Sequence, residues 1–291
     1  MVLLAAGAVF LFPVRPEKVQ LPNPNGYDDF RKAATLIATP PDDLTTVSDD
    51  EFRRFVEANA EALRLVRAGL AKDCKVPVTY TYAVSEERLN ELSGLKSIAQ
   101  ALVAIGRWHE RQQQTNEAAR RYVEAIRYGH HSLREGLLTD ILMTIAIERI
   151  ASRPLRKSAP TLDAALCREI ISALQQIDDS VEPIDRVFER DNEIIQTEHR
   201  FAYYWYRLVS AISGRTALSG LTANAHAKAR QHYDASRRQR YELIAELAAR
   251  AYELEHGRPP KGFDDLCPAY IKNIPPEFRT ATNAIYNFPS Q

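Results

Sequence analysis

Glycine is scarce in this sequence, with 11 residues in a chain of 291. Tight hairpin turns between strands need glycine, because its backbone reaches conformations that are closed to other residues. The scarcity therefore disfavours an all-β fold. A charge excess is missing as well, since 38 basic and 38 acidic side chains leave no net charge. Proteins that bind nucleic acid usually carry a basic excess that neutralises phosphates, so we expect no nucleic-acid partner.

Cysteine is also rare. The three cysteines, Cys74, Cys167 and Cys267, lie far apart and form no Cys-x-x-Cys pair. This spacing excludes a zinc ribbon and a thioredoxin-type redox motif. The odd count fits either three reduced thiols or one disulfide with a single free thiol. We favour three buried or partly buried thiols.

Familiar catalytic motifs are missing too: the sequence contains no G-x-S-x-G, H-E-x-x-H, P-loop or G-x-G-x-x-G. Glu253 and His256 have the Glu-x-x-His spacing of di-iron bundles, but a second such motif is lacking, so we interpret them as a charged helix end. His130 and His131 follow Gly129, which favours a polar loop between two helices. We therefore assign no catalytic residue, no cofactor and no metal ligand.

Residues 1–14 form an apolar N-terminal segment that is uncharged from Val2 to Phe12. As a helix, these 11 residues cover about 16 Å, short of the roughly 30 Å hydrocarbon core of a membrane. Three interpretations remain: a truncated signal-anchor, a degenerate signal peptide, or a helix buried in the fold. We favour the signal-anchor, because the run has no polar face of the kind that a core helix carries.

Residues 15–42 are predicted to be a tether between this segment and the body. Pro22 and Pro24 block helix formation, and the Asn25-Gly26 pair favours a turn.

Residues 43–257 are predicted to form one helical domain, because apolar residues recur at helical spacing in about seven segments. The segments begin near Ser48, Ser85, Thr115, Ser132, Pro160, Ser180 and Asn224. Ser48 and Glu51 have the spacing of a capping box, and the fourth segment stops before Pro154. Short connections imply antiparallel neighbours, so we predict an all-α, antiparallel helical-hairpin array or bundle with an irregular C-terminal tail.

Two stretches are candidate partner-binding surfaces. Residues 201–206 place five aromatics within about one and a half helical turns, so they point in nearly all directions. The candidates there are Tyr203, Tyr204, Trp205 and Tyr206. Residues 226–240 are rich in arginine, and Arg237 and Arg238 are candidates for contact with an anionic partner or lipid headgroups. A buried aromatic core and a solvated helix face are the default interpretations of the two stretches.

Residues 99–132 resemble one tetratricopeptide-type helical hairpin. The matching residues are Leu102, Ile105, Gly106, Trp108 or His109, Ala118, Tyr122 and Ala125. In such a hairpin small residues allow close approach and an aromatic ring fills the gap. We therefore predict that Gly106 faces the helix that carries Ala118 and Tyr122.

Residues 247–276 are similar to the motif that follows the long helix of type II secretion major pseudopilins. The motif is carried by Tyr252, Gly257, Pro260, Leu266, Pro268, Tyr270 and Pro275. Its physical content is a helix stop at Gly257 and Pro260 and a turn that folds back. We expect the tail, residues 258–291, to pack on the last helix through Phe263, Leu266, Tyr270 and Ile271.

Taken whole, the chain resembles uncharacterised bacterial envelope families that combine an N-terminal anchor, a helical body and this tail. The resemblance implies a membrane-tethered helical scaffold or protein-interaction module of the bacterial cell envelope. Its single N-terminal anchor would sit in the cell membrane, and its body would lie outside the cytoplasm, in the periplasm. The partner protein is not identified by the sequence. The alternative is a hydrolase or metal-dependent enzyme with an unrecognised active site.

Overall fold

The computed structural model describes residues 20–41, 46–78, 86–198 and 217–272, and all regular structure in these ranges is helical. The elements are α2 (Gly26–Leu36), α3 (Asp49–Ala58), α4 (Ala60–Leu70), α5 (Glu86–Arg111), α6 (Thr115–Ser132), α7 (Leu138–Ser158), the 3-10 helix η1 (Ala159–Thr161), α8 (Ala164–Ser180), α9 (Ile184–Glu198), α11 (Ala217–His256) and the 3-10 helix η2 (Phe263–Asp265). The predicted all-α fold is confirmed.

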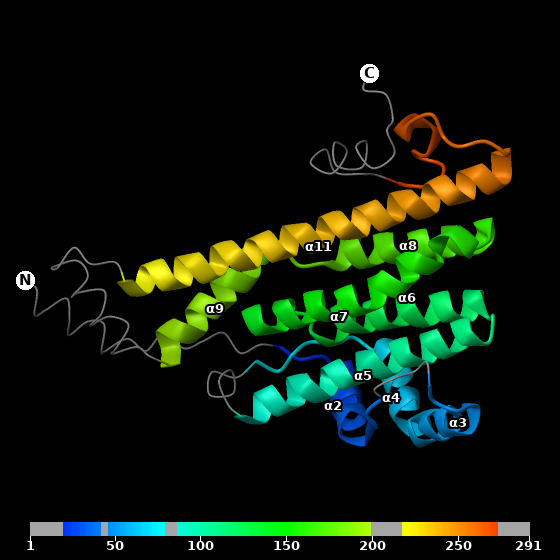
Figure 1. Ribbon diagram of the computed structural model, residues 1–291. Helices are drawn as coiled ribbons and strands as arrows, with labels where there is room; N and C mark the ends of the chain where they lie inside the picture. The colour runs from blue at the N-terminus through cyan, green and yellow to red at the C-terminus, as the bar shows by residue number, and fades with distance from the viewer. Residues whose placement is uncertain (1–19, 42–45, 79–85, 199–216, 273–291) are drawn as a thin grey trace, which may run out of the picture.

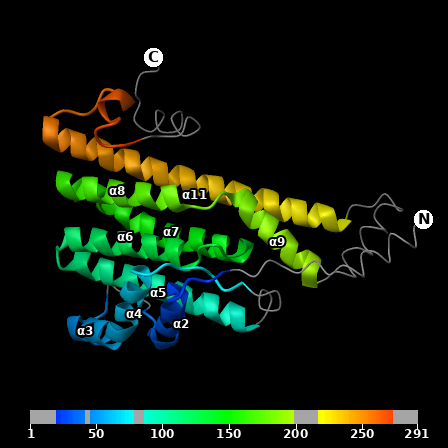
Figure 2. The same cartoon turned by 180° about the vertical axis from the view of Figure 1, so that it is seen from behind.

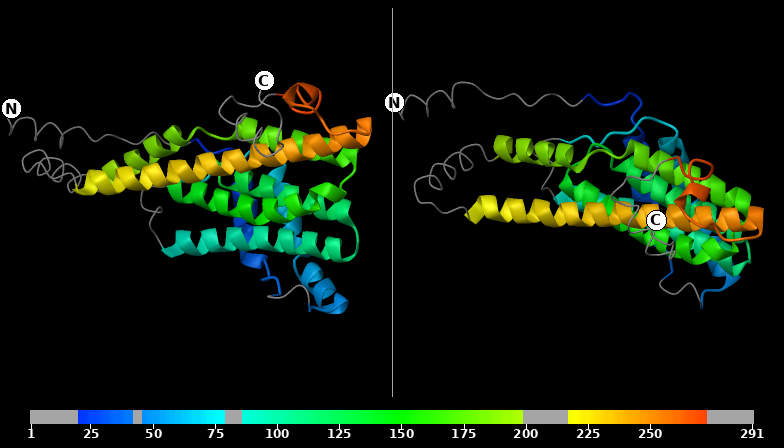
Figure 3. Two further views of the ribbon diagram at one scale, coloured as in Figure 1. Left: turned by 45° about the horizontal axis from the view of Figure 1, so that its top comes forward. Right: turned by 90° about the horizontal axis from the view of Figure 1, so that it is seen from above.

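The helices stack in layers (Figure 1). The longest helix, α11, lies along one side of the molecule, followed by α8, then α6 and α7, then α5, with α2 to α4 on the opposite side. Figure 2 gives the same order from behind. Consecutive helices α5, α6 and α7 are antiparallel neighbours joined by short connections, as predicted for a hairpin array. Figure 3 shows that α9 and the first part of α11 extend beyond this layered body.

One apolar core runs through most of the layers. It contains fully buried side chains from opposite sides of the molecule, including Phe30 of α2 and Ile244 of α11. A second, smaller cluster joins α9 to α11. Its members are Ile184, Val187, Phe188, Ala229 and Tyr233. The extension formed by α9 and α11 therefore has an apolar contact of its own.

The hairpin of α5 and α6 packs as its sequence predicts. A Cβ atom at Gly106 would lie 2.8 Å from Cδ1 of Tyr122, so only glycine leaves room for that ring. Ala118 and Tyr122 are fully buried on the facing helix. The predicted close approach at Gly106 is confirmed.

The structure corrects the predicted tether, because Gly26–Leu36 form helix α2. The Asn25-Gly26 pair begins this helix and does not form a free turn. Asn25 Oδ1 accepts from the Tyr27 N–H at 3.2 Å, and Asn25 Nδ2 donates to the Lys75 carbonyl at 2.9 Å. Tyr27 and Phe30 are fully buried, so burial of one helix face stabilises a segment whose flanking prolines suggested extended chain.

The first predicted helix is two helices, α3 and α4, which meet at the fully buried Asn59. The Ser48 hydroxyl caps α3 by accepting from the Glu51 N–H at 3.3 Å. Asn59 Nδ2 donates to the Phe55 carbonyl at 2.9 Å, and its Oδ1 accepts from the Ala38 N–H at 2.8 Å. The break thus ties α3 and α4 to the segment after α2.

The boundaries of α7 also differ from the prediction. Ser132 belongs to α6, and α7 begins at Leu138, where the Asp140 carboxylate accepts from the Leu137 N–H at 2.6 Å. Pro154 lies inside α7 and does not end it. A proline removes one backbone hydrogen bond, but Ala151 and Leu155 beside it are fully buried, and this packing holds the helix together.

The last helix ends as predicted. Gly257 has a φ of +67°, the left-handed conformation that glycine adopts most easily after a helix, and its N–H donates to the Glu253 carbonyl at 2.8 Å. The half-buried Pro260 follows, and the chain turns back.

The described part of the tail, residues 258–272, packs on α11. Leu266 and Ile271 are fully buried in the main core, and the Tyr270 ring lies 5.9 Å from that of Tyr252. The predicted fold-back is confirmed for these residues. Leu254, which was also expected in the contact, is instead 43% exposed.

The apolar N-terminal segment, residues 1–14, lies outside the described residues. Among the helices that the structure describes, none combines the length and apolar character needed to cross a membrane.

Candidate functional site

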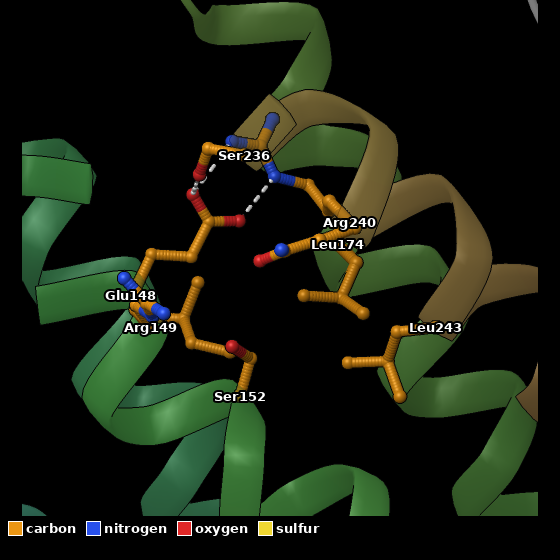
Figure 4. Close-up of a pocket in the computed structure, with 9 residues that line it drawn as sticks. Glu148, Arg149, Ser152, Leu174, Ser236, Arg240 and Leu243 are labelled. Carbon is orange, nitrogen blue, oxygen red and sulfur yellow. Dashed lines mark hydrogen bonds and ion pairs between the residues drawn. The ribbon is translucent and has the colours of Figure 1, made fainter. Parts of the chain in front are cut away.

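Four helices bring polar and charged side chains together inside the body, and Figure 4 shows Glu148, Ser236 and Arg240 among them. Arg240 of α11 donates to both carboxylate oxygens of Glu148 on α7, at 2.7 and 3.0 Å. Its third nitrogen, Nη1, donates to Asp178 Oδ1 of α8 at 2.6 Å. Nε2 of His130 on α6 lies 3.1 Å from Glu148 Oε2. We call these four residues the buried charge centre.

Further groups complete the hydrogen bonding of the buried charge centre. The Ser236 hydroxyl donates to Glu148 Oε2 at 2.8 Å, and the Tyr241 hydroxyl donates to Asp178 Oδ2 at 2.5 Å. Burial by itself raises the pKa of Glu148, but Arg240 and His130 more than offset it and hold that pKa well below its usual range. Burial, together with the charge of Arg240, lowers the pKa of His130. The carboxylate is therefore ionised and the imidazole neutral at pH 7.

The space beside the Glu148–Arg240 pair is too small for a substrate. Two cavities border it, with volumes of about 10 and 20 Å³. Because one water molecule needs roughly 10–15 Å³, each has room for about one water at most. The buried charge centre therefore acts structurally, by fixing α11 against α6, α7 and α8.

A second buried ion pair plays the same part on the other side of the core. Arg88 of α5 donates to the Asp140 carboxylate of α7 and to the Tyr27 hydroxyl of α2, and it contacts Glu91 at 3.1 Å. Arg88 and Asp140 are 3% and 1% exposed. This set joins α2, α5 and α7 in a fixed arrangement.

An open groove runs between α4, α6 and α8, with a volume of about 740 Å³. Helix α6 contributes Arg120, Val123 and Arg127, which share one face because they are spaced three and four residues apart. Leu70 of α4 and Ala173 of α8, both half-buried, add apolar surface. The charged lining residues are the four arginines Arg67, Arg120, Arg121 and Arg127 and the two glutamates Glu124 and Glu169. The groove is thus partly apolar and carries a basic excess.

A second hollow, of about 240 Å³, adjoins the groove and shares Arg127, Ala173 and Gln176 with it. We call it the end hollow, because it lies beside the last turns of α6 and α8. Its ionisable lining residues are Arg127, His130, His131 and Arg134, and none of its lining residues is acidic. Basic side chains from one helix end therefore converge on a concave surface.

The predicted loop at His130 and His131 is wrong, because both residues lie in the last turn of α6. His130 joins the buried charge centre. His131 Nε2 lies 2.8 Å from the Lys72 carbonyl, and it must donate there because a carbonyl only accepts. Each histidine thus has a partner from a different element, which sequence neighbours do not reveal.

The predicted basic stripe on α11 is largely neutralised. Arg237 donates to Asp178 at 3.2 and 3.3 Å, so it belongs to the surroundings of the buried charge centre. Arg240 is 4% exposed and Arg230 pairs with Asp185. Arg238 is exposed and remains available to a partner. The aromatic candidates Tyr203, Tyr204, Trp205 and Tyr206 lie outside the described residues.

Sequence analysis did not single out Glu148 or Asp178. One signal was present, because Asp140, Thr144 and Glu148 are spaced by four residues and so lie on one face of α7. All three are buried. A polar stripe of this kind usually faces water, and only the tertiary contacts show that this one faces the interior.

The remaining candidates from the sequence are the cysteines and the Glu253–His256 pair. Cys74 and Cys167 are buried and Cys267 is half-buried, and burial raises the pKa of Cys74 to about 12 and that of Cys167 to about 11, so neither of these two is a reactive thiolate at neutral pH. His256 stacks on Tyr252, with ring centroids 4.1 Å apart. Among the described residues, no group of three or more His, Cys, Asp or Glu side chains is placed to hold a metal ion.

Comparison with known proteins found no relative from which a function could be inferred. A scan against protein-family models, a search of curated proteins and a search of solved structures found no match to this chain.

Proposed function

We propose that this protein is a membrane-tethered helical scaffold of the bacterial cell envelope, and that it binds a segment of a partner protein in the groove between α4, α6 and α8. The groove itself is the observation that carries this proposal. It combines apolar surface at Val123, Leu70 and Ala173 with charged side chains at its sides. Grooves of this composition along paired helices suit the apolar face of an amphipathic helix.

Charge selects among the possible partner segments. With four arginines and two glutamates in its lining, the groove complements a segment that carries acidic side chains beside its apolar face. The buried charge centre supports the same role, because it fixes α6 and α8, two of the three helices that form the groove. A surface with a fixed shape loses little freedom on binding, and this favours affinity.

Site-specific photo-crosslinking in cells tests the groove. A photoreactive amino acid at Val123 should give a discrete crosslinked product with one partner. The matched control is Leu89 of α5, which is 64% exposed and does not line the groove. A product that forms equally from both positions, or no product from Val123, would contradict the proposed binding site.

Membrane attachment is proposed from residues 1–14, whose run from Val2 to Phe12 is uncharged. The full native protein should fractionate with membranes, and a reporter fused after Gly26 should be active outside the cytoplasm. A protein found only in the soluble cytosolic fraction would contradict the tether and would leave the groove to be judged by its own crosslinking test.

A further inference from the structure

The end hollow concentrates positive charge that the rest of the protein neutralises only weakly. Arg127 is exposed and makes no ion pair within the ranges that the structure describes. Arg134 lies 3.8 Å from Asp73 and 3.9 Å from Glu135, at the outer limit of ion pairing. Elsewhere in the groove the arginines have close acidic partners: Arg121 lies 2.6 Å from Glu124, and Arg120 lies 3.4 Å from Glu169. The least compensated positive charge therefore lies at one end, in the end hollow.

His131 can supply one more hydrogen-bond donor when its imidazole is protonated. Its Nε2 already donates to the Lys72 carbonyl, so protonation would add a second donor at Nδ1. Burial lowers the pKa of His131, and the charges of Arg134 and Arg127 lower it further, while the hydrogen bond to the Lys72 carbonyl and the charge of Asp73 act in the opposite direction. An anion next to these arginines would offset their effect and favour the protonated imidazole.

We propose that the end hollow binds a carboxylate side chain of the partner's acidic segment, held by Arg127 and Arg134, while the rest of the segment lies along the groove. This inference rests on the function proposed above and adds the chemistry and the position of the anchoring group. Guanidinium groups hold carboxylates through paired, charge-assisted hydrogen bonds. The volume of about 240 Å³ admits an Asp or Glu side chain with its neighbouring backbone.

The competing explanation is local. Basic residues near the end of α6 interact favourably with the helix dipole, and this alone would account for their position. The two explanations differ in what is lost on substitution. A dipole role affects the stability of the protein, whereas an anchoring role affects affinity for an acidic ligand.

The test uses the full chain and a labelled synthetic helical peptide of Glu, Ala and Leu, measured by fluorescence anisotropy. A peptide of the same length with Gln in place of Glu is the control ligand. We expect the acidic peptide to bind and the Gln peptide to bind at least about tenfold more weakly, since the neutral amide cannot make charge-assisted hydrogen bonds as a carboxylate does. The double variant Arg127→Gln/Arg134→Gln should weaken acidic-peptide binding about tenfold, and Arg238→Gln should not.

Three outcomes would overturn the proposal. Equal binding of the two peptides would show that no carboxylate is anchored, while the Val123 crosslink would still report on the groove. Unchanged affinity in the double variant together with a lower unfolding midpoint would assign both arginines to the helix dipole. Saturable binding of inorganic phosphate that Arg127→Gln abolishes, without peptide binding, would show that the occupant is a small anion. A rise in the pKa of His131 on adding the acidic peptide, followed by NMR, would support the proposal.

Discussion

At the scale of single residues, the interior of the protein holds charges that are buried yet fully partnered. Glu148 receives hydrogen bonds from Arg240 and Ser236, and Asp178 receives them from Arg240 and Tyr241. An ion pair of this kind adds little net stability relative to apolar side chains, because burying charges is costly. Removing only one partner of the pair is strongly destabilising, because the remaining charge stays buried and loses its partner.

Arg240→Met should therefore destabilise the protein strongly. The substitution leaves Glu148 and Asp178 buried without their common cation, and breaking such a pair costs about 3–5 kcal/mol. Urea unfolding followed by circular dichroism measures the change. Arg238→Met on the same helix is the control, because Arg238 is exposed. Equal unfolding midpoints for the two variants would contradict the structural role of the buried charge centre.

The histidines predict a pH dependence. Burial lowers the pKa of His130 and of His131 in the folded protein, whereas the unfolded chain titrates near 6.5. As pH falls below about 6.5 the unfolded state binds protons first, so the free energy of unfolding falls. The measurement is the urea midpoint between about pH 7.5 and pH 5.5. His130→Gln should reduce the slope, and a slope equal to that of the wild type would remove His130 as its source.

A substitution at Gly106 tests the packing of α5 against α6. Gly106→Leu must displace the Tyr122 ring, and overpacking of this kind costs about 1–3 kcal/mol. Gly262→Leu is the matched control, because a Cβ atom there meets no atom within 4 Å. Thermal unfolding should show a lower midpoint for the first variant only. If the midpoint of Gly106→Leu is unchanged, the close approach of α5 and α6 is not as described.

At the scale of elements, local sequence predicted most helices and one of their contacts. The stop at Gly257 and the packing of Gly106 on Tyr122 both follow from residue size and backbone preference over short distances. What failed depends on distant partners. Asn59 divides α3 from α4 through a bond to Ala38, Asn25 begins α2 through bonds to Lys75, and Pro154 stays helical because its neighbours are buried.

Weakening the contact between the tail and the core should lower the free energy of unfolding. Leu266→Ala removes a fully buried side chain, and such substitutions cost about 2–5 kcal/mol. The control, Leu254→Ala, changes a leucine that is 43% exposed and should shift the unfolding midpoint far less. Similar midpoints in the two variants would mean that the tail is not part of the cooperative fold.

At the scale of the whole molecule, neither the buried charge centre nor the groove was predictable from sequence. The pairs Glu148–Arg240 and Asp178–Arg240 join residues separated by 92 and 62 positions, and hydrophobic periodicity carries no information about such pairing. The groove likewise forms only where α4, α6 and α8 come together. Sequence could predict that α6 has an exposed face with Arg120, Val123 and Arg127, but not which helices flank that face.

The most direct test of the account asks whether the Val123 crosslink depends on the charge of the groove. The photoreactive amino acid is kept at Val123 while Arg127→Glu or Arg238→Glu is introduced, and partner crosslinking in cells is quantified for both. Arg127→Glu reverses a charge in the groove, whereas Arg238→Glu reverses an exposed charge on α11. We predict that the crosslinked product is lost with Arg127→Glu and retained with Arg238→Glu, and that the two variants have equal unfolding midpoints. Retention with Arg127→Glu, or loss with Arg238→Glu alone, would contradict it.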